Sequence, residues 1–388
     1  MAAVFSAIAA LAFAPSVPAN ILVGAGGCDV SDRQCVAPAM PFSDQIVALS
    51  NGNLHNYTAA GSPSWIHKVD GCVFAALTSA SQVASYRLQA DGTLSAVSSE
   101  PSMGMFPVKL DSRGSVLIVA NYGGTTGATV TTFLFDQQSC SLNTAGSTMP
   151  FQRHSIDPLR QANSHVHTVV VDKAASTSQS FQVLAADLGG DVVYTLSVEQ
   201  INGAINLLHT SLMKPGSGPR HIAIHPTLRI AYVVHEMANE LSVHGIDGSS
   251  GALIPLQTLS TVPSASPLPK CTGLSEEQTM CSKAAEIAIT GNGDSVFVSN
   301  RGFGSPNTNS ISGYKVLMNG TVEFVQLAPS LTRYPRGMVL TPNSSQLLVA
   351  GQGSGNLVGF ALGQAGTVRL PGVQLAAGLA TPTTVVSF

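Results

Sequence analysis

The chain has 388 residues, of which 44% are hydrophobic and 10% are charged, and its formal net charge is −3. This composition excludes an intrinsically disordered chain, which would carry many charges and few apolar residues. The low charge also argues against a long helical bundle, and a slightly negative chain offers no basic field to nucleic acid. We therefore expect a globular protein without a nucleic-acid partner.

The first 19 residues have the features of a secretory signal peptide. Residues 2–14 are almost entirely apolar, and the small residues Ser16 and Ala19 follow. A short apolar run that ends in small residues fits cleavage after about Ala19. No later run reaches the roughly 18 consecutive apolar residues of a membrane span. The sequence predicts a secreted, extracellular protein in which residues 20–388 form one domain.

The cysteines agree with an oxidising compartment. None belongs to a C-x-x-C motif, which disfavours a zinc ribbon, so we expect three structural disulfides. The candidates are Cys28, Cys35, Cys72, Cys140, Cys271 and Cys281. Spacing favours Cys28–Cys35 and Cys271–Cys281 as local links and leaves Cys72–Cys140 by elimination, although six cysteines can pair in about 15 ways.

Three Asn-x-Ser/Thr triplets are candidate glycosylation sites. They begin at Asn56, Asn319 and Asn343. Glycans at such triplets lie on the surface of secreted proteins, so we expect all three asparagines to be exposed.

A short aliphatic strand that leads into a Gly, Asn or Asp turn recurs along the chain. The copies begin at Ile21, Val73, Val116, Val183, Ala231, Val296 and Leu347. A period of about 50 residues without helical stretches is typical of four-stranded propeller blades. We predict an all-β fold, a seven-bladed β-propeller. A tandem array of β-sandwiches is the alternative, but it predicts flexible linkers, and the sequence shows none.

A second marker precedes most of these strands at a constant distance. Its copies are Pro63-Ser-Trp65, Phe106-Pro-Val108, His165-Val-His167, Gly218-Pro-Arg-His221, Ala285-Glu-Ile287 and Tyr334-Pro-Arg336. No copy precedes Ile21, but a similar segment, Pro382-Thr-Thr-Val-Val386, lies at the C-terminus. This displacement predicts that the C-terminal strand completes the first blade and closes the ring, which protects the sheet edges.

Equivalent positions of successive blades lie on a ring around the propeller axis, so the repeat predicts which distant residues meet. The marker positions provide His165, His167, Arg220, Glu286 and Arg336, and the turns after the next strands provide Asn121, Asp187, Glu236, Arg301 and Gln352. Guanidinium groups suit carboxylates or phosphates, and carboxyl and imidazole groups can transfer protons. We expect an anion clamp beside an acid/base group. Alternatively, the arginines pair with the glutamates and only tie blades together.

Metal and cofactor motifs are weak in this chain. His165 and His167, with His221 and His225, could supply imidazoles, but the spacing forces no third zinc ligand. The chain lacks a nucleophile elbow of the form G-x-S-x-G, and no phosphate-binding loop precedes a helix. We expect no metal and no cofactor.

Several segments carry a family resemblance. They are residues 160–167, 186–190, 216–221, 232–236, 284–287, 298–302 and 335–336. In these segments the chain resembles the seven-bladed lactonase family, which contains the propeller-type 6-phosphogluconolactonases and the fungal 3-carboxy-cis,cis-muconate lactonizing enzymes. The resemblance implies that the catalytic residues are His167, Arg220, Glu236 and Arg301. The other candidates from the ring, expected to bind substrate, are His165, His221, Glu286 and Arg336.

The resemblance also implies a function. We expect a secreted enzyme that opens or closes the lactone ring of a small acidic molecule by chemistry like that of 6-phosphogluconolactonase. One alternative is a cyclase that forms a lactone from a carboxymuconate-like acid. A second alternative, from another class, is a secreted propeller that binds an anionic ligand or a partner without turnover.

Overall fold

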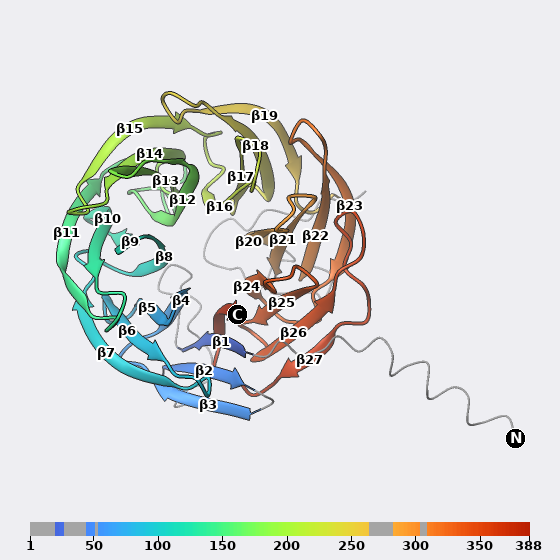
Figure 1. The fold of residues 1–388 in the computed structure, drawn as a ribbon. Coiled ribbons are helices and arrows are strands. Elements are labelled where there is room, and N and C mark those ends of the chain that lie inside the picture. Colours follow the sequence, from blue (N-terminus) through green and yellow to red (C-terminus); the bar gives the residue numbers. More distant parts are fainter. Residues whose placement is uncertain (1–19, 27–43, 51–52, 264–281, 303–308) are drawn as a thin grey trace, which may run out of the picture.

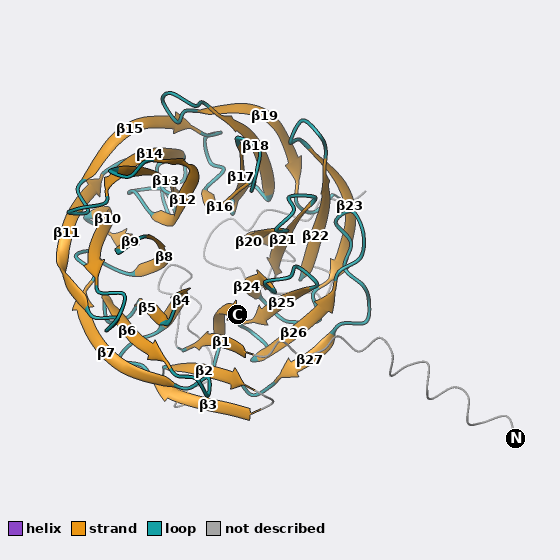
Figure 2. Ribbon diagram, in the orientation of Figure 1, coloured by secondary structure: helices purple, strands orange, loops and turns teal. Residues whose placement is uncertain are grey.

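The computed structural model describes residues 20–26, 44–50, 53–263, 282–302 and 309–388 (Figure 1). The regular elements in these residues are all β-strands, which Figure 2 shows as arrows joined by loops. The described part of the chain contains no helix of the length and apolar character needed to cross a membrane. The all-β prediction is confirmed.

The described strands form seven four-stranded antiparallel sheets arranged as blades around one axis (Figure 1). The innermost strands contact those of the neighbouring blades and surround the axis. They are β28 (Pro382–Ser387), β4 (Pro63–Val69), β8 (Pro107–Arg113), β12 (Val166–Ser176), β16 (Pro219–Ile224), β20 (Ser282–Ile289) and β24 (Pro335–Leu340). The second strands are β1 (Asn20–Ala25), β5 (Cys72–Leu77), β9 (Val116–Gly124), β13 (Ser180–Asp187), β17 (Ile230–His235), β21 (Ser295–Gly302) and β25 (Gln346–Gly351).

The two remaining strands of each blade lie farther from the axis (Figure 1). The third strands are β2 (Gln45–Ser50), β6 (Gln82–Leu88), β10 (Gly127–Phe135), β14 (Val192–Glu199), β18 (Glu240–Ile246), β22 (Ser310–Val316) and β26 (Asn356–Ala361). The outer strands are β3 (Asn53–Thr58), β7 (Leu94–Pro101), β11 (Leu142–Phe151), β15 (Ile205–Leu212), β19 (Leu253–Ser260), β23 (Val322–Pro329) and β27 (Val373–Ala376).

The C-terminal strand closes the ring, as the displaced marker predicts. Strand β28 pairs with β1, with Val386 opposite Leu22 and Val385 opposite Val23. The hydroxyl of Thr383 donates hydrogen bonds to the carbonyls of Gly24, at 3.2 Å, and of Pro63 in the next blade, at 2.8 Å. The first blade is therefore assembled from both ends of the chain, and its inner edge is covered.

The core lies between the blades, because successive residues of a strand face opposite sides of its sheet. On β1, Ile21 and Val23 pack toward Leu348 of the last blade, whereas Leu22 packs toward Ala75 of the second. Full burial of each such aliphatic side chain stabilises the fold by about 1.5–3 kcal/mol. This inter-blade packing positions the inner strands rigidly around the axis.

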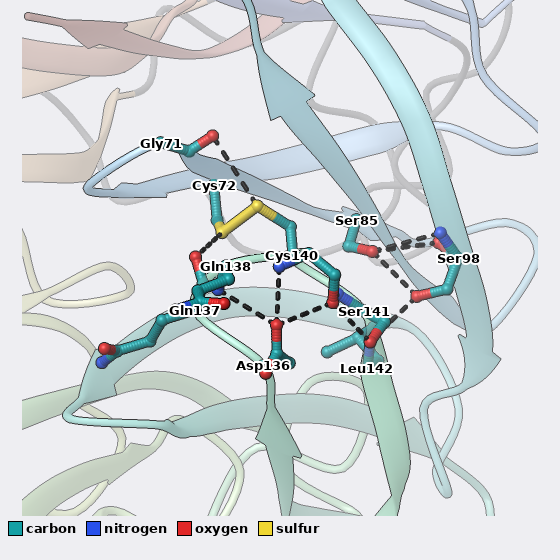
Figure 3. Close-up of a disulfide and its surroundings, with 11 residues drawn as sticks. Gly71, Cys72, Ser85, Ser98, Asp136, Gln137, Gln138, Cys140, Ser141 and Leu142 are labelled. Atoms are coloured by element: carbon teal, nitrogen blue, oxygen red, sulfur yellow. Dashed lines mark hydrogen bonds between the residues drawn. A yellow bond between two sulfur atoms is a disulfide. The ribbon is translucent and has the colours of Figure 1, made fainter.

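A disulfide between Cys72 and Cys140 joins the second and third blades (Figure 3). Cys72 begins β5, and Cys140 lies between β10 and β11; the Cα atoms are 5.4 Å apart, as disulfide geometry requires. The prediction for this pair is confirmed. The other cysteines, namely Cys28, Cys35, Cys271 and Cys281, lie outside the described residues, as does the expected signal peptide of residues 1–19.

The asparagines of the three glycosylation triplets are exposed. Asn56 lies on the outer strand β3, Asn319 lies between β22 and β23, and Asn343 lies between β24 and β25. Their positions leave room for glycans, whose presence stays a prediction.

Candidate active site

A local irregularity near the start of the inner strands sets the positions of several candidate site residues. In β12, the pair Val166–Asp187 is followed by Thr168–Ala186, so His167 is an extra residue in the ladder. Arg220 and Arg336 occupy the same bulge position in β16 and β24. In β20 the shift spans residues 285–286 and includes Glu286. Such β-bulges redirect side chains and are common near functional sites.

Glu236 is the centre of a buried group of guanidinium ions. It follows β17, and its carboxylate forms ion pairs with Arg220 Nε at 2.9 Å, Arg301 Nη2 at 2.8 Å and Arg160 Nη2 at 2.7 Å. Glu236, Arg220 and Arg301 are nearly inaccessible to solvent, whereas Arg160 is partly exposed. The structure thus brings together three of the four residues that the resemblance implied as catalytic.

The electrostatic surroundings keep Glu236 ionised. Burial by itself would raise its pKa, but the charges of Arg301, Arg160 and Arg220 together hold the pKa well below its usual range. Burial, together with the neighbouring Arg301 and Arg336, lowers the pKa of Arg220 to about 10, so its guanidinium remains cationic at neutral pH. A carboxylate with such a low pKa is a weak base and a strong anchor for arginines.

Arg160 was not among the residues expected from the repeat. It lies in the loop between β11 and β12, where its backbone N–H donates to Asp157 at 3.0 Å. The amide of Gln161 anchors the same loop to Leu188 O at 2.9 Å. A loop residue has no repeat position, so only its place in the family-like segment 160–167 could have signalled it.

A second buried group lies beside the first and involves His221 and Glu286. His221 Nδ1 is 2.5 Å from Glu286 Oε1, and the Lys109 ammonium is 3.9 Å from the same oxygen. Lys109 lies over the ring of Trp65, 3.3 Å from its centroid. His221 Nε2 is 3.2 Å from Arg220 Nη1, which connects the two groups. Neither Lys109 nor Trp65 was expected from the repeat to be a site residue.

The remaining histidines lie next to Tyr122. The ring of His165 stacks on Tyr122 with centroids 4.2 Å apart, and the ring of His167 meets Tyr122 edge-on at 5.6 Å. His167 is also 5.1 Å from the ring of His221, and its Nδ1 has no hydrogen-bond partner among the described residues. Burial and the charge of Arg220 lower the pKa of His167 well below 6.5, so the imidazole is neutral at pH 7.

Arg336 also belongs to this region. It is buried, and its charge acts on Arg220, His167 and His221. All eight expected site residues therefore lie in one connected region, in which His165 is at the more exposed side.

Two other residues at the predicted turn positions bind backbone groups outside the arginine group. Asn121 donates to Ser102 O at 2.9 Å, and Asp187 accepts from the backbone N–H groups of His165 and Gly190 at 2.6 and 3.0 Å. Both are therefore structural ties rather than parts of the arginine group. Among the described residues, no group of three or more His, Cys, Asp or Glu side chains is arranged to hold a metal ion.

The fold and the site together define a β-propeller with an arginine–carboxylate centre buried near its axis. The chain belongs to the lactonase family of 7-bladed β-propellers, whose family model matches residues 41–386. A 6-phosphogluconolactonase of Bacillus subtilis is 30% identical over 201 residues, which are 52% of this chain and 51% of that protein. A 6-phosphogluconolactonase of Formosa agariphila is 23% identical over 72% of this chain and 73% of that protein.

Solved structures show the same fold. A protein from Lactobacillus plantarum superposes with a TM-score of 0.76 at 19% identity, covering 95% of this chain and 99% of that one. The periplasmic gluconolactonase of Pseudomonas aeruginosa superposes with a TM-score of 0.75 at 22% identity, covering 95% and 98%. The prediction of a seven-bladed propeller of the lactonase family is confirmed.

Proposed function

We propose that this protein is a secreted lactone hydrolase that acts on a small acidic lactone. The observation that carries the proposal is the convergence of Arg220 and Arg301 on Glu236, beside the neutral imidazole of His167. Membership of the lactonase family and relatives named 6-phosphogluconolactonase support the same chemistry.

The arginines suit an anionic substrate. Nε of Arg220 donates to Glu236 at 2.9 Å, and Nη1 donates to Ala285 O at 2.8 Å and to His221 Nε2 at 3.2 Å. The remaining two N–H donors of this rigidly held group lie on Nη2. Guanidinium groups bind carboxylate or phosphate strongly, and fixed donors stabilise the oxyanion that forms when water attacks a lactone carbonyl. Because the arginines crowd one another, an added anion would relieve their mutual repulsion.

The hydrolysis consumes one water for each lactone. The water oxygen bonds to the carbonyl carbon, the ring C–O bond breaks, and the ring oxygen takes up a proton to give the hydroxy acid. Arg220 and Arg301 hold the acidic group or the oxyanion, and His167 offers its Nδ1 to the substrate. Glu236 aligns the arginines; its low pKa makes it unsuited to activate the water.

The experiment is a panel of aldonolactones with and without a phosphate or carboxylate group, followed by acid release at constant pH. We expect turnover of acidic members and a large loss in the Arg220→Ala and Arg301→Ala variants. Loss of diene absorbance from a muconate without acid release would favour the cyclase instead. Tight binding of carboxylates without turnover of any lactone would favour the non-catalytic propeller.

Secretion is part of the proposal. The residues that support it are the apolar segment 2–14 and the buried disulfide Cys72–Cys140, because disulfides persist in oxidising compartments. Expression of the full chain in a secreting host should release a protein whose N-terminal sequence begins near Asn20. Retention of the unprocessed chain inside the cell would contradict secretion.

A further inference from the structure

We propose that His221 and Glu286 form the proton-transfer pair of the lactone hydrolysis, with Lys109 as the positioning residue that sets the proton affinity of Glu286. In this assignment, His221 meets the attacking water and Glu286 receives the proton through the imidazole. The inference rests on the proposed function, and it assigns the proton to a carboxyl group other than Glu236.

Four inner strands bring the pair and its neighbours together. Trp65 lies on β4, Lys109 on β8, His221 on β16 and Glu286 on β20, so the cluster crosses the axis. Glu286 and His221 are each 3% exposed, and Lys109 is 8% exposed. The ring of Trp65 meets His221 edge-on at 5.8 Å and holds the Lys109 ammonium over its face. Water is largely excluded, so charges and hydrogen bonds in this cluster act strongly.

The hydrogen bonds determine which nitrogen of His221 carries the proton. A guanidinium group can only donate, so Arg220 Nη1 donates to His221 Nε2 at 3.2 Å. The ring proton of neutral His221 therefore lies on Nδ1 and points at Glu286 Oε1, 2.5 Å away. In this tautomer, the lone pair of Nε2 accepts the 3.2 Å hydrogen bond from Arg220 Nη1, and Nδ1–H already points at the final acceptor. The proposed step requires the attacking water to replace Arg220 Nη1 as the donor to Nε2, while Nη1 keeps its hydrogen bond to Ala285 O at 2.8 Å.

The surroundings of Glu286 and His221 also make their pKa values more similar, because they raise the first and lower the second. Burial raises the pKa of Glu286, although Lys109, Arg220, Arg336 and the backbone N–H of Ile287 oppose this rise. Burial and the charges of Lys109, Arg220, Arg336 and Arg301 lower the pKa of His221 well below 6.5. A proton that reaches the imidazole is therefore more stable on Glu286 than it would be with unshifted groups.

The proposed step is balanced. As the water oxygen bonds to the carbonyl carbon, its proton moves to His221 Nε2, and the Nδ1 proton moves to Glu286. When the ring C–O bond breaks, the same protons move in the reverse sense, and His221 protonates the ring oxygen. The pair ends as it began, and one water has been added to the lactone.

Glu286 faces charged groups from each neighbouring inner strand that contributes to the cluster. These groups are Lys109 on β8, Arg220 and His221 on β16, and Arg336 on β24. Among them, only Lys109 can be replaced without removing a member of the arginine clamp or the imidazole. The Lys109→Met variant, which retains apolar bulk, therefore tests the role of the charge.

The test is the pH dependence of kcat/KM for wild type, Glu286→Gln, Lys109→Met and the double variant. In the wild type, activity should fall at acidic pH as Glu286 becomes protonated. Glu286→Gln can still accept from Nδ1–H but takes no proton, so kcat should fall about 10²–10⁴-fold and the acidic decline should vanish. In Lys109→Met, loss of the positive charge should move the acidic decline of kcat/KM to a higher pH by about one pH unit. In the double variant, which lacks the Glu286 carboxylate, this shift should not occur.

Lys68→Met is the matched control, because Lys68 also lies over an aromatic ring, that of Phe388, at 5.0 Å. It should leave the pH profile unchanged. Circular dichroism and the imidazole Nδ1–H signal of His221 show whether each variant is folded with the pair intact. If kcat/KM of Glu286→Gln still declined at acidic pH, or if the decline in Lys109→Met occurred at the same pH as in the wild type, this inference would be wrong. The proposed function would not be affected by that result. Absence of lactone turnover by the wild type would overturn the proposed function and this inference with it.

Discussion

Arg301 in the sixth blade and Glu236 at the end of β17 in the fifth form a buried ion pair with an N–O distance of 2.8 Å. Arg220, from β16 of the fifth blade, binds the same carboxylate oxygen at 2.9 Å. The arginines were expected either to tie blades together or to bind an anion. The same contacts with Glu236 allow both roles. The carboxylate that joins the blades also aligns the guanidinium groups, so changes at this centre should affect both stability and activity.

Replacement of Arg301 by Ala should lower kcat/KM for an acidic lactone by about 10²–10³-fold, the loss typical of removing one fixed donor to an oxyanion. Steady-state kinetics on a turned-over lactone measure this effect. Arg301→Lys is the control that retains the charge and loses the planar donor fork, so it should recover part of the activity. Wild-type kinetics in Arg301→Ala would remove this arginine from the clamp.

Replacement of Glu236 by Gln should lower the free energy of unfolding by about 3–5 kcal/mol, because three arginine side chains lose their common counter-ion. Urea denaturation measures the change. Added phosphate should raise the Tm of this variant more than that of the wild type. The control is Glu240→Gln, whose partner Lys214 is largely exposed, and a change below about 1 kcal/mol is expected there. Equal effects of the two substitutions would contradict the central role of Glu236.

Joint replacement of Cys72 and Cys140 by Ala should lower the free energy of unfolding by about 4 kcal/mol. The disulfide closes a long loop, with a sequence separation of 68, and so restricts the unfolded chain. Denaturant titration of both proteins under non-reducing conditions tests this. An unchanged denaturation midpoint would show that inter-blade packing alone determines stability in this region.

A buried chain of hydrogen bonds should make the fold sensitive to acid. His235 Nε2 and His244 Nε2 both contact the hydroxyl of Ser242 at 2.7 Å. Burial, with the nearby charge of His244, lowers the pKa of His235 to about 3, and burial lowers the pKa of His244 to about 4. Between about pH 6.5 and these values, the unfolded chain binds protons that the folded chain does not, so stability falls as pH falls.

The expected loss is about 2 kcal/mol for each histidine between pH 7 and pH 5. Urea denaturation at both pH values measures it in the wild type and in His244→Gln, which should lose less stability on acidification. His209→Gln, at a partly exposed position on the outer strand β15, is the control and should behave like the wild type. Identical acid sensitivity in His244→Gln and the wild type would contradict the prediction.

The architecture and much of the site could be predicted from the sequence. Each blade of a propeller has the same strand arrangement and packs against its neighbours in the same way, so the sequence pattern recurs with a regular period. The spacing of strand and marker segments indicated the blades, and the marker at Pro382 indicated ring closure. The same spacing placed His167, Arg220 and Arg336 at equivalent positions near the axis, and the structure shows that each occupies a bulge there.

Only the tertiary structure decided which of these residues act together. Asn121 and Asp187 share their repeat position with Glu236, yet Asn121 binds the segment that leads into its blade and Asp187 binds backbone of its own blade. Arg160 reaches Glu236 from a loop that has no repeat position, and Lys109 reaches Glu286 from another blade. A repeat determines the distance of a residue from the axis, whereas side-chain direction depends on bulges, loops and neighbouring blades that meet only in the closed ring.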